Sequence, residues 1–402
     1  MSVRNTFPQQ RPTLNLDFAN SKTLDPRITF TRSQTGNGVT YVDESGFIRD
    51  AVADEPRFDH DPETGECLGL LIEEQRSNLV TYSEKIGGLF SSYGWANQNS
   101  ITVDVDTTDV SDPSGGNSAS KLTNGSSSPV SQTLKTCSLS ATVYTASVYL
   151  RTLSGTETAS INVFLQSSPY TTIATSGVLT ITSEWRRYDI TTSTATSADY
   201  NFGIQVRSGT IYAWGAQLEA GTFPTSYIPT SGSTATRNRD TVSMTGDNFS
   251  DWYNQSEGSF YMNIRNIQQQ PTGSAYTRLI DLRGTPTGDN YYLLAIVPNG
   301  RAIYNEMFSN GSSQLNYSAT YPVPNSPTGI VKITTGLQQN NFIAYNFASQ
   351  FLSDTSSVTL PILNTLYIGR DQNGGSQING HISKLTYYPT RLSNDQLQNL
   401  TK

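Results

Sequence analysis

The sequence is poor in charged residues, histidine and cysteine. Asp, Glu, Lys and Arg make up only 15% of its 402 residues, against about 25% in an average soluble protein. There are two histidines, His60 and His381, and two cysteines, Cys67 and Cys137. So few histidines argue against His-dependent catalysis and against a His-based metal site. The cysteines fall in different predicted regions, and we expect free thiols in a protein made in a reducing cytoplasm.

Other absences narrow the class of protein further. The net charge is −7 and no Lys/Arg-rich run occurs, which argues against nucleic acid and anionic membranes as partners. No apolar run approaches the roughly 18–20 residues of a membrane span, so we predict no membrane insertion. The opening MSVRNTFPQQRP lacks the apolar stretch of a secretory signal. No G-x-S-x-G, P-loop, H-E-x-x-H or C-x-x-C motif occurs, and we therefore predict that the protein is not an enzyme.

What the sequence does contain is short runs of alternating apolar and polar residues. Examples are Tyr144–Arg151, Phe202–Arg207 and Phe260–Arg265. Period-2 alternation is typical of strands with one buried face, and turn residues separate the runs. No long helix, heptad pattern or internal repeat is visible. Only near the end does a helix signal occur, where Ser393 stands as a cap three residues before Gln396.

The chain is organised around the stretch Ile211–Asp240. It begins with the alternation of a strand and then becomes a run of Ser and Thr punctuated by Gly221, Pro224, Pro229 and Gly232. Such a run has too little apolar content to form a core. We interpret it as the last strand of one sandwich followed by the tether to the next.

This organisation predicts an all-β protein with tandem antiparallel β-sandwiches and a short C-terminal helix. We divide the chain into an N-terminal region with short strands (1–80), a sandwich (81–229), a linker (230–240) and a second sandwich (241–402). The alternative for the N-terminal strands is that they do not fold alone and add to one of the sandwiches.

Three segments resemble known families. The run WGAQLEAG-x-FPTSYIPT, residues 214–230, resembles the end of jelly-roll, carbohydrate-binding-module-like domains of bacteriophage fibre and other virion proteins. Residues 15–83 carry LDF, ITFTR, YVD-x-x-G-x-I, EPRFDHDP-x-TGE and LGLLIE-x-x-R-x-N in an order that resembles phage structural proteins. The C-terminal IGR, its Gly-rich loop and NGHIS-x-L-x-YYP resemble the laminin-G-like, concanavalin A-like lectin sandwich.

The resemblance implies a non-enzymatic phage virion protein, a fibre or receptor-binding component that recognises host cell-surface glycans. The alternatives are a head fibre or capsid decoration protein and, from the enzyme class, a polysaccharide depolymerase. Implied partners are tail, baseplate or capsid proteins, onto which the N-terminal region would dock. By analogy with phage fibres we expect a homo-oligomer, a trimer, on the virion surface after synthesis in the bacterial host cytoplasm.

Aromatic residues are the first candidates for sugar contacts, because a flat apolar ring face can stack on a sugar. Trp185 and Trp214 lie within predicted strands, where we expect core positions. Trp252 and Tyr253 follow the linker and form the better candidate pair, unless they cover the domain junction.

Two loops are candidates for polar or metal contacts. Asp371 and Asn373 lie in a Gly-rich loop, and the rim of laminin-G-like domains often holds Ca²⁺ or glycan; a plain turn is the alternative. The oxygen-rich loop Asp54–Glu66 has ligands that suit Ca²⁺, but we favour an acidic turn paired with Arg57 or Arg49. His60 is interpreted as structural. We predict no cofactor and leave the metal content open.

Overall fold

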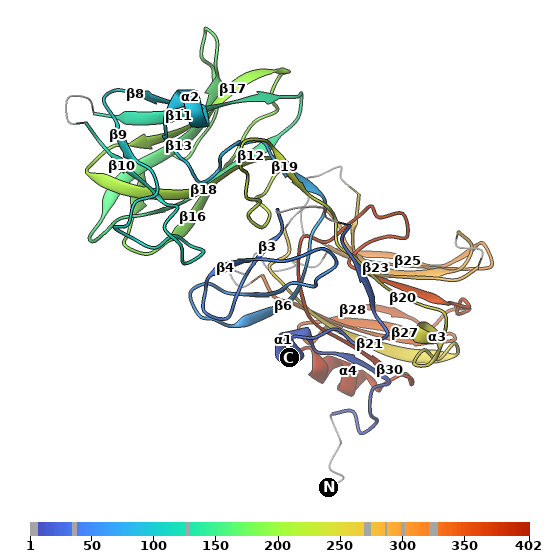
Figure 1. Cartoon of the computed structure of the whole chain (residues 1–402). Coiled ribbons are helices and arrows are strands. Elements are labelled where there is room, and N and C mark those ends of the chain that lie inside the picture. The colour runs from blue at the N-terminus through green and yellow to red at the C-terminus, as the bar shows by residue number, and fades with distance from the viewer. Residues whose placement is uncertain are drawn as a thin grey trace. The chain divides into compact units, whose positions relative to one another are not determined.

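The structure confirms the predicted all-β class. A computed structural model describes residues 7–33, 38–125, 129–268, 275–285, 288–298, 302–320 and 329–402. Within these ranges every strand pair of the sheets is antiparallel, and the helices are a few residues long (Figure 1). None of these helices is long and apolar enough to cross a membrane. Both cysteines carry free thiols.

The chain forms two compact units that interleave in sequence. The first unit contains Met1–Ser33, Ala53–Glu74 and Arg239–Lys402, and the second contains Gln34–Val52 and Gln75–Asn238. The chain therefore passes from one unit to the other more often than the predicted order of consecutive domains requires.

The N-terminal 80 residues are divided between the two units. Their strands have three to six residues, too few to bury an independent core. All but two of them pair with strands from later in the chain or join sheets that contain such strands; the exceptions, Thr40–Val42 and Ile48–Asp50, pair with each other. This division corresponds to the alternative in which the N-terminal strands add to the sandwiches. The stretch 230–238 belongs to the second unit, where β19 (Ala235–Arg237) pairs with β7 (Arg76–Asn78).

Two sheets build the first unit. One contains, in spatial order, β28 (Ser349–Asp354), β27 (Phe342–Asn346), β26 (Val331–Gln338), β21 (Glu257–Arg265), β30 (Gly380–Tyr388), β6 (Cys67–Ile72) and β5 (Phe58–His60), with β1 (Leu14–Leu16) also on β30. The other contains β2 (Thr29–Thr31), β20 (Thr241–Thr245), β29 (Thr365–Ile368), β22 (Thr277–Arg283), β23 (Tyr291–Ile296), β24 (Ala302–Ser309) and β25 (Ser312–Thr320).

One continuous apolar core lies between these sheets. Leu14 of β1, Leu70 of β6 and Phe260 of β21 meet Leu282 of β22 and Leu366 of β29 in it, each at most 1% exposed. The N-terminal strands thus contribute buried side chains as well as backbone hydrogen bonds. Two short helices, α1 (Phe18–Ser21) and α3 (Asp247–Ser250), each add a phenylalanine to the same core.

The predicted C-terminal helix is confirmed as α4 (Asn394–Leu400). Ser393 caps it with both bonds of a capping box: its hydroxyl accepts from the Gln396 backbone N–H, and the Gln396 side chain accepts from the Ser393 N–H. Leu397 is fully buried against the outer face of the first sheet of this unit.

The second unit is a separate sandwich. One sheet has the order β16 (Arg186–Thr191), β12 (Tyr144–Arg151), β18 (Thr210–Ala220), β10 (Ser120–Thr123) and β9 (Thr102–Asp104). The other has the order β14 (Thr172–Thr175), β13 (Glu157–Leu165), β17 (Ala198–Val206), β11 (Ser131–Leu139) and β8 (Trp95–Gln98), with β15 (Leu179–Ile181) on β13. A short helix, α2 (Phe90–Tyr93), precedes β8.

A small hairpin of β3 (Thr40–Val42) and β4 (Ile48–Asp50) packs on the outer face of the β18 sheet. Ile48 joins Tyr212 and Trp214 of β18 in a second, smaller apolar cluster there. This cluster is distinct from the core between the two sheets, and it forms the base of the pocket described next.

Candidate functional site

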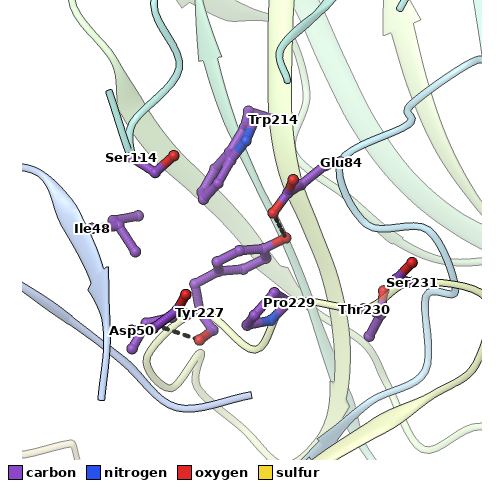
Figure 2. A pocket seen from close by; sticks show the side chains of 10 residues that line it. Ile48, Asp50, Glu84, Ser114, Trp214, Tyr227, Pro229, Thr230 and Ser231 are labelled. Carbon is purple, nitrogen blue, oxygen red and sulfur yellow. Dashed lines mark hydrogen bonds between the residues drawn. The ribbon is translucent and has the colours of Figure 1, made fainter. Parts of the chain in front are cut away.

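A pocket of about 290 Å³ opens on the second unit between β18, the β3–β4 hairpin and the segment that follows β18 (Figure 2). Its floor consists of buried residues: Thr40, Ile48, Trp214 and Tyr227. Its rim consists of exposed or half-buried residues: Asp50, Glu84, Ser114, Pro229, Thr230 and Ser231. An apolar floor with a polar rim is the usual composition of a small-molecule site.

The segment after β18 is folded back onto its own strand by two buried polar side chains. Gln217 accepts a hydrogen bond from the Ile228 backbone N–H at 2.7 Å, and Glu219 accepts from the Thr225 N–H at 2.9 Å and the Thr225 hydroxyl at 2.7 Å. Both side chains are fully buried, and the Gln217 amide donates to Glu219 at 2.6 Å. These bonds place Tyr227 and the residues after it over the strand, because buried backbone donors need such partners.

Gly215 lets Tyr227 approach the strand. The φ of Gly215 is +63°, a left-handed backbone conformation that residues with a side chain rarely adopt. A Cβ at this position would lie 3.2 Å from the Tyr149 ring and 3.3 Å from the Tyr227 ring. The pairing of β12 with β18 shifts register at the same level, between Ser147 and Tyr149. The irregularity therefore makes room for the aromatic floor.

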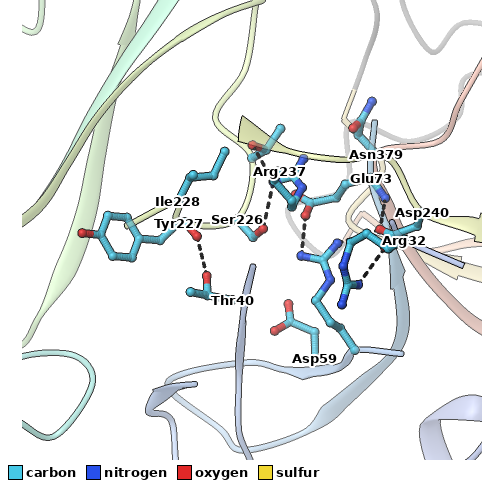
Figure 3. Close-up of polar contacts among 12 residues, drawn as sticks. Arg32, Thr40, Asp59, Glu73, Ser226, Tyr227, Ile228, Arg237, Asp240 and Asn379 are labelled. Atoms are coloured by element: carbon cyan, nitrogen blue, oxygen red, sulfur yellow. Dashed lines mark hydrogen bonds and ion pairs between the residues drawn. The ribbon is translucent and has the colours of Figure 1, made fainter. Parts of the chain in front are cut away.

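The hairpin is fixed to the same segment. The Thr40 hydroxyl donates to the Tyr227 carbonyl at 2.6 Å (Figure 3). The Ile48 N–H donates to the Pro113 carbonyl at 2.9 Å, and the Arg49 guanidinium donates to the Ser114 carbonyl at 3.0 Å. Three segments distant in sequence therefore define the pocket together.

The aromatic floor is rigid. The Trp214 and Tyr227 ring centroids lie 4.5 Å apart, and each residue is only 2% exposed. The Trp214 Nε1–H donates to the Ser118 hydroxyl at 2.8 Å, and the Tyr227 hydroxyl bonds to the Ser83 hydroxyl at 2.6 Å and to Glu84 at 3.2 Å. Burial raises the pKa of Tyr227 well above its usual value, so the phenol stays neutral.

Two neighbouring carboxyl groups have pKa values shifted in opposite directions. Burial raises the pKa of Glu84, and the Asp112 carboxylate raises it further, against hydrogen bonds from Ser118 and Tyr227. Burial also acts to raise the pKa of Asp112, but hydrogen bonds donated by Ser114, Ser118 and Gly116 outweigh it, and the net pKa is lowered. Asp112 thus stays ionised and adds negative potential beside Glu84.

The four site residues that the sequence predicts lie in the first unit, and none of them is among the ten residues that line the pocket. Trp252 lies in the core of the first unit, where it is 2% exposed and packs edge-on against Phe249 and Tyr387. Tyr253 packs against the same core and stacks on Tyr387. The expected exposure of the pair fails because both rings pack against Phe249 of α3 and against Tyr387.

The two polar candidates form a turn. An Asp371 side-chain oxygen accepts from the backbone N–H groups of Asn373 and Gly375, each at 2.8 Å. Such Asx geometry accounts for the residue types in this loop. Of the two tryptophans expected in the core, Trp214 is buried, while Trp185 is half-buried and donates to the Ser111 carbonyl at 2.8 Å.

The acidic segment Asp54–Glu66 contains the strand β5 and, after it, a turn in which Asp61 accepts from the N–H groups of Glu63 and Thr64. Arg57 does not face solvent: it is buried in the first unit and pairs with Glu73 at 2.8 Å and Asp240 at 2.7 Å. Arg32 also pairs with Asp240 there (Figure 3). Arg49 pairs with Asp43 at 2.7 Å. Among the described residues no group of three or more His, Cys, Asp or Glu could hold a metal ion.

The sequence analysis predicts no binding site at the residues that line the pocket. Most of these residues nevertheless come from two segments that the sequence analysis singles out. Five lining residues (Trp214, Tyr227, Pro229, Thr230, Ser231) come from the stretch 211–240, and three more (Thr40, Ile48, Asp50) come from the resembling segment 15–83. The two most recognisable segments of the chain therefore meet at one place.

No protein-family model matches the sequence, and no curated protein matches it either. Partial structural likenesses exist. The CBM40 domain of Ruminococcus gnavus IT-sialidase bound to alpha2,3 sialyllactose is 14% identical, with 37% of this chain and 84% of that chain covered and a TM-score of 0.32. The binding domain of botulinum neurotoxin DC in complex with rat synaptotagmin II is also 14% identical, with 41% of this chain and 40% of that chain covered and a TM-score of 0.32.

Proposed function

We propose that this protein binds glycans without hydrolysing them, and that the pocket of the second unit is the binding site. The observation that carries the proposal is the composition of the pocket: a rigid aromatic floor surrounded by hydroxyl and carboxyl groups. Sugar rings present apolar C–H faces and many hydroxyls, which are matched by this combination. Because the floor residues are held by hydrogen bonds before any ligand arrives, little ordering is needed on binding.

We further propose that the protein is a surface component of a phage particle, a fibre or receptor-binding protein, with capsid decoration as the alternative. The support is the resemblance of residues 15–83 and 214–230 to virion proteins, together with their convergence on the pocket. A shallow single site would bind with low affinity, and several copies on a particle, as in the proposed trimer, would supply avidity. Gold labelling of intact particles distinguishes a tail position from a capsid position.

The test is a glycan array probed with a multimerised full-length chain. Ser231→Trp places a large ring at the exposed rim of the pocket and should abolish binding while leaving stability unchanged. Ser154→Trp, at another exposed position of the same unit, is the matched control and should bind like the wild type. Binding that survives Ser231→Trp would place the site elsewhere, and release of reducing ends by the wild type would contradict the non-enzymatic role.

A further inference from the structure

The charged residues that line the pocket are all acidic. Asp50 and Glu84 are on its rim, and none of the ten lining residues is Lys, Arg or His. The Asp112 carboxylate stays ionised and makes the electrostatic potential at Glu84 more negative. Asp50 is exposed on β4, at the mouth of the pocket, so both an entering and a bound ligand meet a carboxylate.

Two cations that neighbour lining residues, Arg49 and Lys85, are each paired with a carboxylate of their own. Arg49 pairs with Asp43 while it donates to the Ser114 carbonyl, and Lys85 pairs with Asp106. Each of these pairs is close to neutral as a unit. They offset little of the charge on Asp50 and Glu84.

The size of the pocket limits what it can hold. About 290 Å³ lies just below the roughly 300–1,000 Å³ found for small-molecule sites, which suits one sugar ring with its neighbours outside. A ring that fills the pocket must bring its substituents close to the rim carboxylates. An acidic substituent would therefore be placed beside a like charge, with no cation among the lining residues to receive it.

We propose that the pocket takes a sugar without an acidic group, either neutral or bearing a free amine, and rejects sialic and uronic acids. This inference rests on the proposed glycan-binding function and specifies its ligand class. Hydroxyls and amines can donate hydrogen bonds to Asp50 and Glu84, whereas a sugar carboxylate can only accept. The preference for neutral or amine-bearing sugars over acidic sugars thus has two causes: the charge of the rim carboxylates and their need for hydrogen-bond donors on the ligand.

The experiment compares pairs of glycans that differ by one acidic group or one acidic sugar: glucose disaccharides with their glucuronic acid counterparts, and lactose with alpha2,3-sialyllactose, which carries an additional sialic acid. In every pair that the full-length protein binds, the neutral member should bind at least about tenfold more tightly at low salt. Salt should narrow the difference by screening the rim charges. An acidic member that binds equally or more tightly overturns the inference and leaves glycan binding in place.

Variants that neutralise the rim carboxylates test whether their charge is the cause of the preference for neutral glycans. Asp50→Asn lies on the exposed rim and should reduce the neutral-over-acidic preference by about threefold or more, and Glu84→Gln should act in the same direction. A preference that both variants retain in full would overturn the electrostatic explanation. If no glycan of a broad panel binds to the wild type, the proposed function itself fails and the inference fails with it.

Discussion

At the residue scale, the site depends on carboxyl groups whose surroundings decide their charge. Asp112 accepts five hydrogen bonds, from the N–H and hydroxyl groups of Ser114 and Ser118 and the N–H of Gly116, all between 2.6 and 2.9 Å. It thereby holds in place the loop that carries Ser114 to the rim of the pocket. All five bonds favour the ionised form, which explains why its pKa falls despite burial.

This arrangement predicts an acid-sensitive contribution to stability. A carboxyl whose pKa is lower in the folded state stabilises the fold above its unfolded pKa, and the contribution is lost as pH falls through the folded value. Asp112→Asn should therefore cost about 1–3 kcal/mol of unfolding free energy near neutral pH. The gap between variant and wild type should close in acid.

Urea denaturation at a series of pH values from about 6 down to about 2 measures this gap. Asp104→Asn, at an exposed position of the same unit, is the control and should follow the wild type throughout. A gap between Asp112→Asn and the wild type that stays constant with pH would show that the ionised state of Asp112 is not what holds the loop.

At the scale of elements, the segment after β18 is held against that strand by hydrogen bonds. Its turn residues predict a linker, and its Ser, Thr and Pro content is indeed too polar for a core. What fixes it is the pair Gln217 and Glu219, which point from β18 and accept hydrogen bonds from Thr225 and Ile228. The segment is ordered because its backbone donors find partners on the strand.

Glu219→Leu should release this segment. It leaves two donors of Thr225, the N–H and the hydroxyl, buried without their acceptor, at a cost of about 1–3 kcal/mol each. Glu184→Leu removes a carboxylate from an exposed position in the same unit and should change stability by less than about 0.5 kcal/mol. Denaturation curves give the stabilities, and retention of both stability and glycan binding by Glu219→Leu would contradict this role.

At the scale of the whole molecule, the interleaving of the two units has a consequence for how the chain can be cut. In the second unit, the hairpin β3–β4 that lines the pocket comes from residues 34–52, and the other strands come from residues 75–238. The hairpin contributes Thr40, Ile48 and Asp50 to the pocket but no strand to either large sheet. The sandwich and the pocket are therefore separable in principle.

Two fragments test this separation. Residues 75–238 alone should form the sandwich, with the near-ultraviolet signal of packed aromatic rings, but should not bind glycan. Residues 34–238 should form the sandwich and bind, because the hairpin is restored. Glycan binding by the shorter fragment would show that the hairpin is not part of the site.

The sequence by itself determined the fold class, the strand runs and the C-terminal helix. Period-2 alternation and capping are local properties, so Tyr144–Arg151 and Ser393–Gln396 are recognisable without any partner. The sequence also singled out both segments that line the pocket, although only as resemblances.

Only the tertiary structure decided which residues meet. Whether Trp252 is exposed depends on the packing of its ring against Tyr387, more than a hundred residues away, and no local pattern contains that contact. The same holds for Thr40 and Tyr227, which build the pocket across 187 residues of sequence. A three-residue strand buries too little surface to choose its own partner, so the sheets that accept them settle where strands such as β1 and β2 lie. The β3–β4 hairpin, which carries part of the site, is placed by its packing on Tyr212 and Trp214 of β18.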